Sequence, residues 1–372
     1  MIYKFGDIAN NVTEKRSPKP EDSQNYIGLE HLDSGSLYVN RYGIDVELKG
    51  DKLVMHKGDV LLGKRNAYLR RAAIAPHDGL FSAHGMILRP KDVIASEFFP
   101  FFIASDKFFD DVIRISVGGL SPTVNWKDLK ELEFDLPSLA EQKVLAEKLW
   151  AAYEVKQSYL KMIAATEEMV KLQFIEMFGS PYVGWKYPTK SLGDVYHIGT
   201  GGTPDRKISS YYEGQIPWVK STEVNYCELY DTEEHISEQA INDSNCSLYP
   251  SGTILLAMYG QGTTRGRVAL LRTDATVNQA IAAIQVQDET ESLFLYSMLK
   301  VCYDFVRNLA VGGNQHNLNL KLVSSIPIVF PPKELQQKFV SIAHQSDKSI
   351  SELRKSVDAI DKVIKSLINE NL

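Results

Sequence analysis

The chain contains the same short motifs twice, about 190 residues apart. Three motifs share an offset of 194 residues. They are Val117-Gly118-Gly119 with Val311-Gly312-Gly313, Gly58-Asp59-Val60-Leu61-Leu62 with Gly252-Thr253-Ile254-Leu255-Leu256, and Ile74-Ala75 with Val268-Ala269. Near the start of each half, Gly6-Asp7-Ile8 matches Gly193-Asp194-Val195. A period of this length is far too long for a solenoid. The sequence therefore predicts a duplicated unit, made of a globular domain and a helix.

Each half of the chain changes from short strand-like segments to one long helical pattern. In residues 140–178, apolar side chains fall on one helical stripe at mostly three- and four-residue spacing: Leu145, Leu149, Ala152, Tyr159, Ile163, Thr166 and Val170. In the last forty residues, Ile350, Leu353, Val357, Ile360, Ile364 and Leu367 step by three and four, which is a coiled-coil seam. Two such seams in equivalent positions are expected to pack on each other.

We therefore predict an α+β protein with two similar globular domains and two long antiparallel coiled-coil helices, related by an internal pseudo-two-fold axis. The expected boundaries are 1–136 for the first domain, 137–180 for the central helix, 181–331 for the second domain and 332–372 for the C-terminal helix. Within the first domain, residues 96–115 are expected to be helical and residues 132–136 to form the last strand.

Composition and charge argue against a uniformly basic nucleic-acid-binding protein and against a membrane protein. The 372 residues carry a net charge of −6, and the two helical tracts together hold 12 acidic and 12 basic side chains, so the globular parts carry the excess. Binding to nucleic acid would therefore have to come from local basic loops. No membrane-length apolar run or signal peptide is present, and the three cysteines are widely spaced, so we expect a cytoplasmic protein with reduced thiols and no membrane partner.

Motifs of catalytic centres are missing. Gly199-Thr200-Gly201-Gly202-Thr203-Pro204 is rich in glycine but lacks the Lys-Ser/Thr ending of a phosphate loop. The eight histidines are scattered without metal-ligand spacing, and no nucleophile motif is present. We expect no catalytic residue and no metal site.

Two polar, locally basic loops follow the matching strands of the two copies. The candidate DNA-binding residues of the first loop are Lys64, Arg65, Asn66, Tyr68, Arg70 and Arg71, and those of the second are Tyr259, Gln261, Thr263, Thr264, Arg265 and Arg267. The 194-residue offset places Arg71 on Arg265. Arg, Asn and Gln side chains can contact base edges, while Thr, Tyr and Lys suit phosphates. The alternative, that both loops are solvated hairpin tips, stays open.

Several further motifs carry a family resemblance. They are Gly199-Thr200-Gly201-Gly202-Thr203-Pro204, Tyr211-Tyr212, Ile216-Pro217-Trp218-Val219-Lys220, the Gly-Thr-Ile-Leu-Leu strand, Val277-Asn278-Gln279-Ala280, and Pro331-Pro332 followed by Gln336-Gln337. Together they resemble the target recognition domain of type I restriction–modification specificity subunits. In the first copy, Leu136-Pro137 with Glu141-Gln142 matches the helix opening. The first copy lacks the Gly-Gly-Thr-Pro and Ile-Pro-Trp-Val signatures and has Ile27-Gly28-Leu29-Glu30 instead. Lys220, the last residue of Ile216-Pro217-Trp218-Val219-Lys220, is a further candidate DNA-binding residue.

The resemblance covers essentially the whole chain and implies a subunit without chemistry of its own. Each recognition domain would read one half of a bipartite site in double-stranded DNA, and the helices would set the spacer between the halves. Two DNA methyltransferase (modification) subunits and a restriction/translocase subunit would dock on it, in a system that methylates DNA and defends against phage. This chain would hold no cofactor, since S-adenosylmethionine, ATP and Mg²⁺ belong to the partner subunits. Two alternatives remain: a nuclease built from dispersed carboxylates, and a coiled-coil scaffold for two protein-binding domains.

Overall fold

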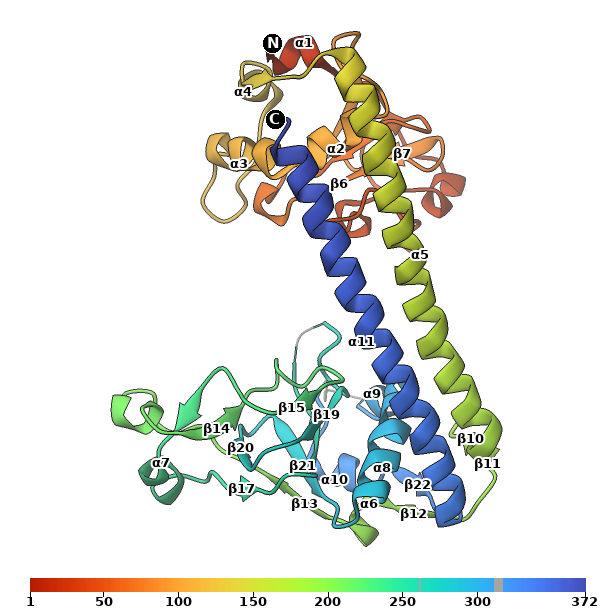
Figure 1. Ribbon diagram of the computed structural model, residues 1–372, viewed down its shortest axis with the longest axis vertical. Coiled ribbons are helices and arrows are strands. Elements are labelled where there is room, and N and C mark those ends of the chain that lie inside the picture. Colours follow the sequence, from red (N-terminus) through yellow and green to blue (C-terminus); the bar gives the residue numbers. More distant parts are fainter. Residues whose placement is uncertain (261, 311–316) are drawn as a thin grey trace. The chain divides into compact units, whose positions relative to one another are not determined.

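The computed structural model describes residues 1–260, 262–310 and 317–372 of the chain (Figure 1). It divides into unit 1, Met1–Lys161 with Leu353–Leu372, and unit 2, Met162–Glu352. The helices α5 (Leu139–Phe178) and α11 (Lys333–Asn369) each contribute residues to both units. Gln261 and the repeated motif Val311-Gly312-Gly313 lie outside the described residues.

Unit 1 is built from short antiparallel strands and small helices. Its strands are β1 (Ile2–Lys4), β2 (Ala9–Val12), β3 (Lys15–Arg16), β4 (Lys52–Met55), β5 (Val60–Leu62), β6 (Ala72–Ile74), β7 (Gly79–Phe81), β8 (Met86–Pro90) and β9 (Glu133–Asp135). They form sheets in the orders β2-β8-β5-β6, β3-β4-β7 and β1-β9. The helices are α1 (Phe5–Ile8), α2 (Phe99–Ala104), α3 (Asp106–Ile115) and α4 (Trp126–Leu129), with 3-10 turns η1 (Pro20–Gln24), η2 (Leu29–His31) and η3 (Ala67–Leu69).

The helical stretch predicted for residues 96–115 forms two helices that meet at Ser105. This serine ends α2 and caps α3, because its hydroxyl oxygen accepts a hydrogen bond from the Phe108 amide at 3.1 Å. Both helices bury phenylalanines in the core of unit 1, where Phe5, Phe102 and Phe134 are enclosed.

Unit 2 has the same kind of architecture, and its two main sheets have more strands. Its strands are β10 (Gly179–Ser180), β11 (Gly184–Trp185), β12 (Thr189–Ser191), β13 (His197–Thr200), β14 (Ile216–Val219), β15 (Glu228–Leu229), β16 (His235–Ile236), β17 (Leu248–Tyr249), β18 (Ile254–Ala257), β19 (Val268–Leu271), β20 (Ala275–Val277), β21 (Ile281–Gln285) and β22 (Pro327–Val329). The sheet orders are β13-β21-β18-β19-β15, β16-β14-β20-β17, β12-β22 and β10-β11. Its helices are α6 (Leu192–Val195), α7 (Glu238–Asn242), α8 (Glu289–Val301), α9 (Tyr303–Asn308) and α10 (Leu320–Ser324), with the 3-10 turn η4 (Ser209–Tyr212).

The predicted duplication is confirmed by the strand registers. In unit 1, β5 lies between β8 and β6, with Leu61 opposite Ile87 and Ala73. In unit 2, β18 lies between β21 and β19, with Leu255 opposite Ala283 and Ala269. The closing ladder is also shared, since β1 pairs with β9 as β12 pairs with β22. Both units therefore have the same antiparallel framework, and the α+β fold class is confirmed.

The central strands are apolar throughout because both faces of their sheet are buried. On β18, Ile254 and Leu256 face the core that includes α8, whereas Leu255 and Ala257 face a second core against β20. Leu61 on β5 likewise faces away from the core that holds Val60 and Leu62. A strand buried on both faces has no alternation of polar and apolar residues, so its sequence is a continuous apolar run.

The two long helices begin in the same way. The side-chain amide of Gln142 donates to the Pro137 carbonyl at 2.9 Å, and that of Gln336 donates to the Pro331 carbonyl at 2.9 Å. The repeated proline and glutamine are thus a shared helix-opening device. Ser138 and Glu141 add a capping box on α5, since the carboxylate of Glu141 accepts from the Ser138 amide at 2.8 Å.

Within each unit, α5 and α11 pack antiparallel. In unit 1 the N-terminal part of α5 meets the C-terminal part of α11, where Lys156 pairs with Asp361 at 2.6 Å and Leu149 and Ile368 share one core. In unit 2 the C-terminal part of α5 meets the N-terminal part of α11, and the rings of Phe174 and Phe339 are 5.2 Å apart. Every residue of the predicted α11 seam is buried or half-buried.

Candidate nucleic-acid interface

The first basic loop, residues 63–71, connects β5 to β6. The Gly63 amide donates to the Arg71 carbonyl at 2.9 Å, which closes the loop at its base. The turn η3 lies between two residues in the left-handed conformation, Asn66 with φ 55° and Arg70 with φ 47°. Residues other than glycine rarely adopt this backbone conformation. The loop therefore has a specific shape rather than that of a loose hairpin tip.

A second segment of unit 1, residues 117–124, lies against this loop. The Asn66 amide donates to the Pro122 carbonyl at 2.7 Å, the Val124 amide donates to the Lys64 carbonyl at 3.0 Å, and the Arg65 guanidinium contacts the Ser121 hydroxyl at 3.3 Å. The fold thus brings together two polar segments more than fifty residues apart. Arg65 and Tyr68 are exposed on the loop.

Lys64 is partly buried in this loop. Burial lowers its pKa below the ordinary lysine value, and repulsion from Lys15 lowers it further. An anion placed beside the two lysines would relieve this repulsion. The pair is therefore suited to a phosphate group.

The other two cations of the loop are held by the protein. The guanidinium of Arg70 pairs with Asp106 and with Asp110, each at 2.5 Å. That of Arg71 donates to the Leu29 carbonyl at 3.0 Å and is half-buried. Sequence reasoning had no means of separating these two arginines from the exposed Arg65.

Counted between its closing residues, the matching loop of unit 2, residues 257–267, is two residues longer. Its base is closed by the Ala257 amide, which donates to the Arg267 carbonyl at 2.9 Å, as Gly63 does to Arg71. The prediction that Arg71 corresponds to Arg265 is therefore wrong, and Arg71 corresponds to Arg267. The offset is 194 residues on β5 but 196 on β6, where Ala73 matches Ala269, so the apparent repeat of Ile74-Ala75 as Val268-Ala269 is wrong as well.

A separate set of contacts holds the loop of unit 2. The Arg267 guanidinium donates to Asn225 at 2.6 Å, also contacts the Thr263 hydroxyl, and lies 5.8 Å from the Tyr226 ring centre. From α9, Arg307 donates to the Gly262 carbonyl at 2.6 Å. Sequence reasoning missed Asn225, Tyr226 and Arg307, because their partners lie about forty residues away along the chain.

The remaining candidates of this loop differ in exposure. Tyr259 and Thr263 are exposed, whereas Thr264 and Arg265 are half-buried. Among the described residues, the Nε atom of Arg265 is buried without a hydrogen-bond partner. Gln261 is outside the part of the chain that the structure describes.

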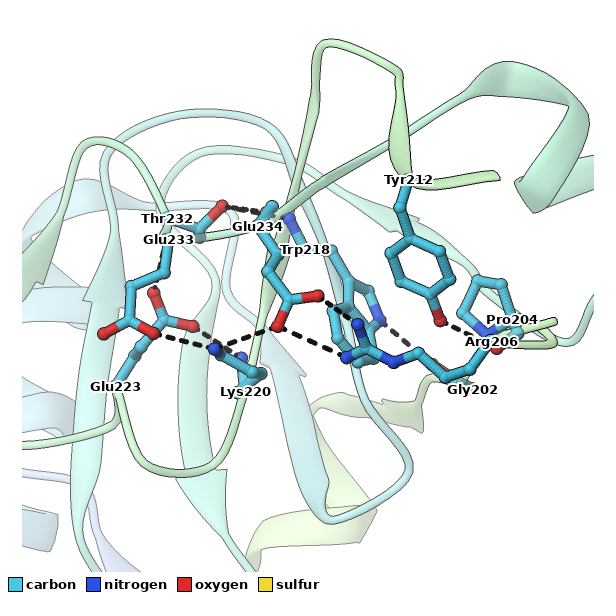
Figure 2. Close-up of polar contacts among 10 residues, drawn as sticks. All are labelled: Gly202, Pro204, Arg206, Tyr212, Trp218, Lys220, Glu223, Thr232, Glu233 and Glu234. Carbon is cyan, nitrogen blue, oxygen red and sulfur yellow. Dashed lines mark hydrogen bonds and ion pairs between the residues drawn. The ribbon is translucent and has the colours of Figure 1, made fainter. Parts of the chain in front are cut away.

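Lys220 lies in a compact group of charged and aromatic side chains (Figure 2). Its ammonium group pairs with Glu233 at 2.7 Å and with Glu234 at 3.0 Å, and these hydrogen bonds raise the pKa of Lys220. Arg206 pairs with the same Glu234 and lies 4.3 Å from the ring centre of Tyr212. Lys220 and Arg206 are thus both neutralised by acidic neighbours.

The glycine-rich motif has a structural explanation in the same group. A Cβ atom on Gly201 would lie 1.6 Å from the Val277 carbonyl oxygen, so only glycine fits there. The Gly202 carbonyl accepts from the Trp218 indole at 3.0 Å, and the Pro204 carbonyl accepts from the Tyr212 hydroxyl at 2.7 Å. The motif therefore packs the segment before η4 onto the tryptophan of β14.

A different kind of surface lies on the unit 2 part of α5. Met162, Met169 and Leu172 each expose about half of their side chains. Residues seven and three positions apart share one face of a helix. Exposed apolar side chains grouped in this way are typical of protein-binding surfaces, and methionine adapts readily to a partner.

The described residues contain neither a metal-binding cluster nor a membrane span. No group of three or more His, Cys, Asp or Glu side chains among them could hold a metal ion. None of the described helices is long and apolar enough to cross a membrane.

Comparison with known proteins identifies the family. The model of the type I restriction modification DNA specificity domain matches residues 1–158 and 182–360. The chain therefore belongs to this family, and each half of it carries one copy of the domain.

Similar proteins agree with this assignment. The specificity subunit of the type I restriction enzyme MjaIX from Methanocaldococcus jannaschii is 28% identical over 207 residues, which is 52% of this chain and 46% of that protein. The EcoR124I/EcoR124II specificity subunit from Escherichia coli is 26% identical over 164 residues, which is 42% of this chain and 40% of that protein. The matches thus span less than half the length of these curated relatives.

Solved structures show the same fold over the whole chain. The S subunit of a type I restriction–modification system from M. genitalium has a TM-score of 0.53 at 14% identity and covers 99% of this chain and 94% of its own. A chain from a study of assembly and conformational transition of the type I R-M system has a TM-score of 0.54 at 17% identity, with 100% and 97% covered.

Proposed function

We propose that this chain is the sequence-reading subunit of a type I restriction–modification complex and is not itself an enzyme. Unit 1 would read one half of a bipartite site in double-stranded DNA, and unit 2 would read the other. The observation that carries the proposal is the duplicated framework of a DNA specificity family, which presents a shaped polar loop at the same place in each unit.

In this proposal the two loops divide the work of recognition. Exposed Arg65 and Tyr68 in unit 1, and exposed Tyr259 and Thr263 in unit 2, are the side chains best placed to meet DNA. Lys64, beside Lys15, is suited to a phosphate. Each arginine that reads a base is expected to contribute about 1–3 kcal/mol of discrimination.

We further propose that two modification subunits and a restriction/translocase subunit dock on the chain in the cytoplasm. S-adenosylmethionine, ATP and Mg²⁺ would be bound by those partners, and this chain would hold none of them. The exposed apolar side chains of α5 in unit 2 support a docking role. Replacing Met162 and Met169 by Asp should weaken association with the modification subunits in co-purification, whereas Lys171→Asp on the same helix should have little effect.

The functional test compares the purified chain with the assembled complex. With Mg²⁺, S-adenosylmethionine and ATP, the chain alone should neither methylate nor cleave DNA, and adding the modification subunits should produce methylation at one bipartite sequence. Turnover by the chain alone would overturn the proposal. In the source genome, deletion of the gene should remove one bipartite pattern of methylated adenines, and complementation should restore it.

A further inference from the structure

Arg70 occupies a backbone position that belongs to glycine in the other unit. Counting back from the loop bases, Arg71 matches Arg267, so Arg70 matches Gly266. Gly266 has φ +87° and Arg70 has φ 47°, so both loops require the left-handed conformation at this point. Glycine adopts it without steric cost, whereas arginine is unfavourable there. An arginine at such a position indicates that its side chain contributes something in return.

The side chain of Arg70 connects the loop to helix α3. Its two terminal nitrogens pair with Asp106 and Asp110, each at 2.5 Å, and the side chain is 35% exposed. The two acids are four residues apart and therefore share one face of α3. Lys365 of α11 reaches the second oxygen of Asp106 at 3.5 Å, so the acid is itself held in place within unit 1.

The loop of unit 2 is also tied to the helix at the corresponding place, but there the donors lie on the helix and the acceptors are backbone carbonyls of the loop. There α9 supplies the cation, since Arg307 donates to the Gly262 carbonyl at 2.6 Å and to the Arg265 carbonyl at 3.4 Å. Tyr303 of α9 donates to the Thr263 carbonyl at 2.8 Å. Both units therefore anchor their loop on this helix, and in unit 1 the loop arginine itself is the anchor.

We propose that Arg70 is a positioning residue that fixes the first loop on α3 and does not contact DNA. The inference rests on the proposed DNA-reading function and revises the sequence-based assignment of Arg70 as a DNA contact. Its guanidinium is already matched by two carboxylates, and a phosphate approaching it would meet their negative charge. Specificity for the first half-site then depends on Arg70 through the placement of Arg65 and Tyr68.

The test uses two neighbouring acids on the same helix. Asp110 belongs to the anchor, whereas Asp111 pairs with Arg114 at 2.7 Å, three residues on along α3. Asp110→Asn and Asp111→Asn remove the same charge, so they change the general attraction to DNA alike. Arg70→Gly removes the anchor from the loop side while leaving the backbone conformation unstrained.

DNA binding by the complex with its modification subunits is measured against salt concentration, for the cognate site and for sites altered in one half. Arg70→Gly and Asp110→Asn should each reduce discrimination in the first half-site by about fivefold or more, relative to Asp111→Asn. Discrimination in the second half-site, and the slope of affinity against salt, should remain unchanged. A slope lowered by about one in Arg70→Gly would show that Arg70 contacts DNA. Discrimination retained in Asp110→Asn would show that the anchor does not set the specificity of the loop. Either result would overturn the proposal.

Amide hydrogen exchange of the full chain gives a readout that needs no DNA. Exchange in residues 64–71 should rise in Arg70→Gly and Asp110→Asn but not in Asp111→Asn. Unchanged exchange in Arg70→Gly and Asp110→Asn would be enough to show that Arg70 does not hold the loop on α3. Failure of the unmodified complex to select any sequence would instead overturn the DNA-reading function, so the two failures are distinguishable.

Discussion

The Arg16–Asp22 ion pair in unit 1 makes the free energy of unfolding depend on pH. The hydrogen bond from Arg16 lowers the pKa of Asp22 from 3.8 to about 2. Because the folded-state pKa is below the unfolded one, the pair stabilises the folded state fully above pH 4, and the contribution is lost as the pH falls toward 2. Asp22→Asn should therefore lower the free energy of unfolding by about 1 kcal/mol at pH 6.

Urea titrations between pH 6 and pH 2 measure this difference. The gap between the original chain and Asp22→Asn should close as the pH approaches 2, while Asp33→Asn, in the more exposed Arg41–Asp33 pair, serves as the control. A gap of constant size over the whole range would contradict the assigned role.

Single residues also show where sequence reasoning stops. The sequence contained both basic loops, but ion pairing decides which of their cations are available. Arg65 and Arg70 look alike in the sequence, whereas Asp106 and Asp110, about forty residues away, pair with Arg70 and not with Arg65. The prediction that Arg71 matches Arg265 was wrong because the second loop has two added residues, which shift the alignment after them. Since Arg265 and Arg267 are both arginines, the sequence alone does not reveal this shift.

At the scale of elements, the junction of α5 and α11 in unit 2 depends on a cluster of phenylalanines. Phe339 of α11 is fully buried and lies 5.2 Å from Phe174 and 5.7 Å from Phe178, between ring centres. Phe339→Ala should cost about 3–5 kcal/mol, because the cavity cannot collapse among rigid rings.

Thermal and urea unfolding check this cost, with Val363→Ala as the control, since Val363 lies on the same helix and is 52% exposed. Faster amide exchange confined to unit 2 would locate the effect. Equal stability of the two variants would show that the ring cluster does not hold the helices.

The elements themselves were predictable to different degrees. The long helices α5 and α11 follow from local periodicity, whereas β5 and β18 were found as short apolar runs that both halves of the sequence repeat. The parallel pairings were not, because β14 with β20 and β15 with β19 join short strands far apart along the chain. The glycine-rich motif was recognised as a family feature, but its packing on Trp218 depends on tertiary contact.

At the scale of the whole molecule, α5 is the covalent connection between the two globular domains, and we expect it to set the number of base pairs between the half-sites. Inserting four residues near Gln157 adds about 6 Å of rise. The insertion also rotates the C-terminal part of α5 by about 40°, which a coiled coil can absorb by local unwinding. With DNA advancing about 3.4 Å per base pair, the preferred gap should grow by about one to two base pairs, and sliding of α11 favours the smaller change.

Mapping the sites methylated by the insertion variant gives the gap directly. Both half-site sequences should stay the same, because neither loop is altered. A gap of unchanged length with full activity would show that another element sets the spacing.

The most direct test of the central claim changes one loop at a time. In the assembled complex, Arg65→Ala in unit 1 and Thr263→Ala in unit 2 are compared by mapping methylated sites in a DNA library with both half-sites randomised. Arg41→Ala, an exposed arginine paired with Asp33 in unit 1, is the control. Each loop variant should relax only one half-site, a different half for each, and the control should relax neither. A loop variant that alters both halves, or two variants that alter the same half, would contradict the account.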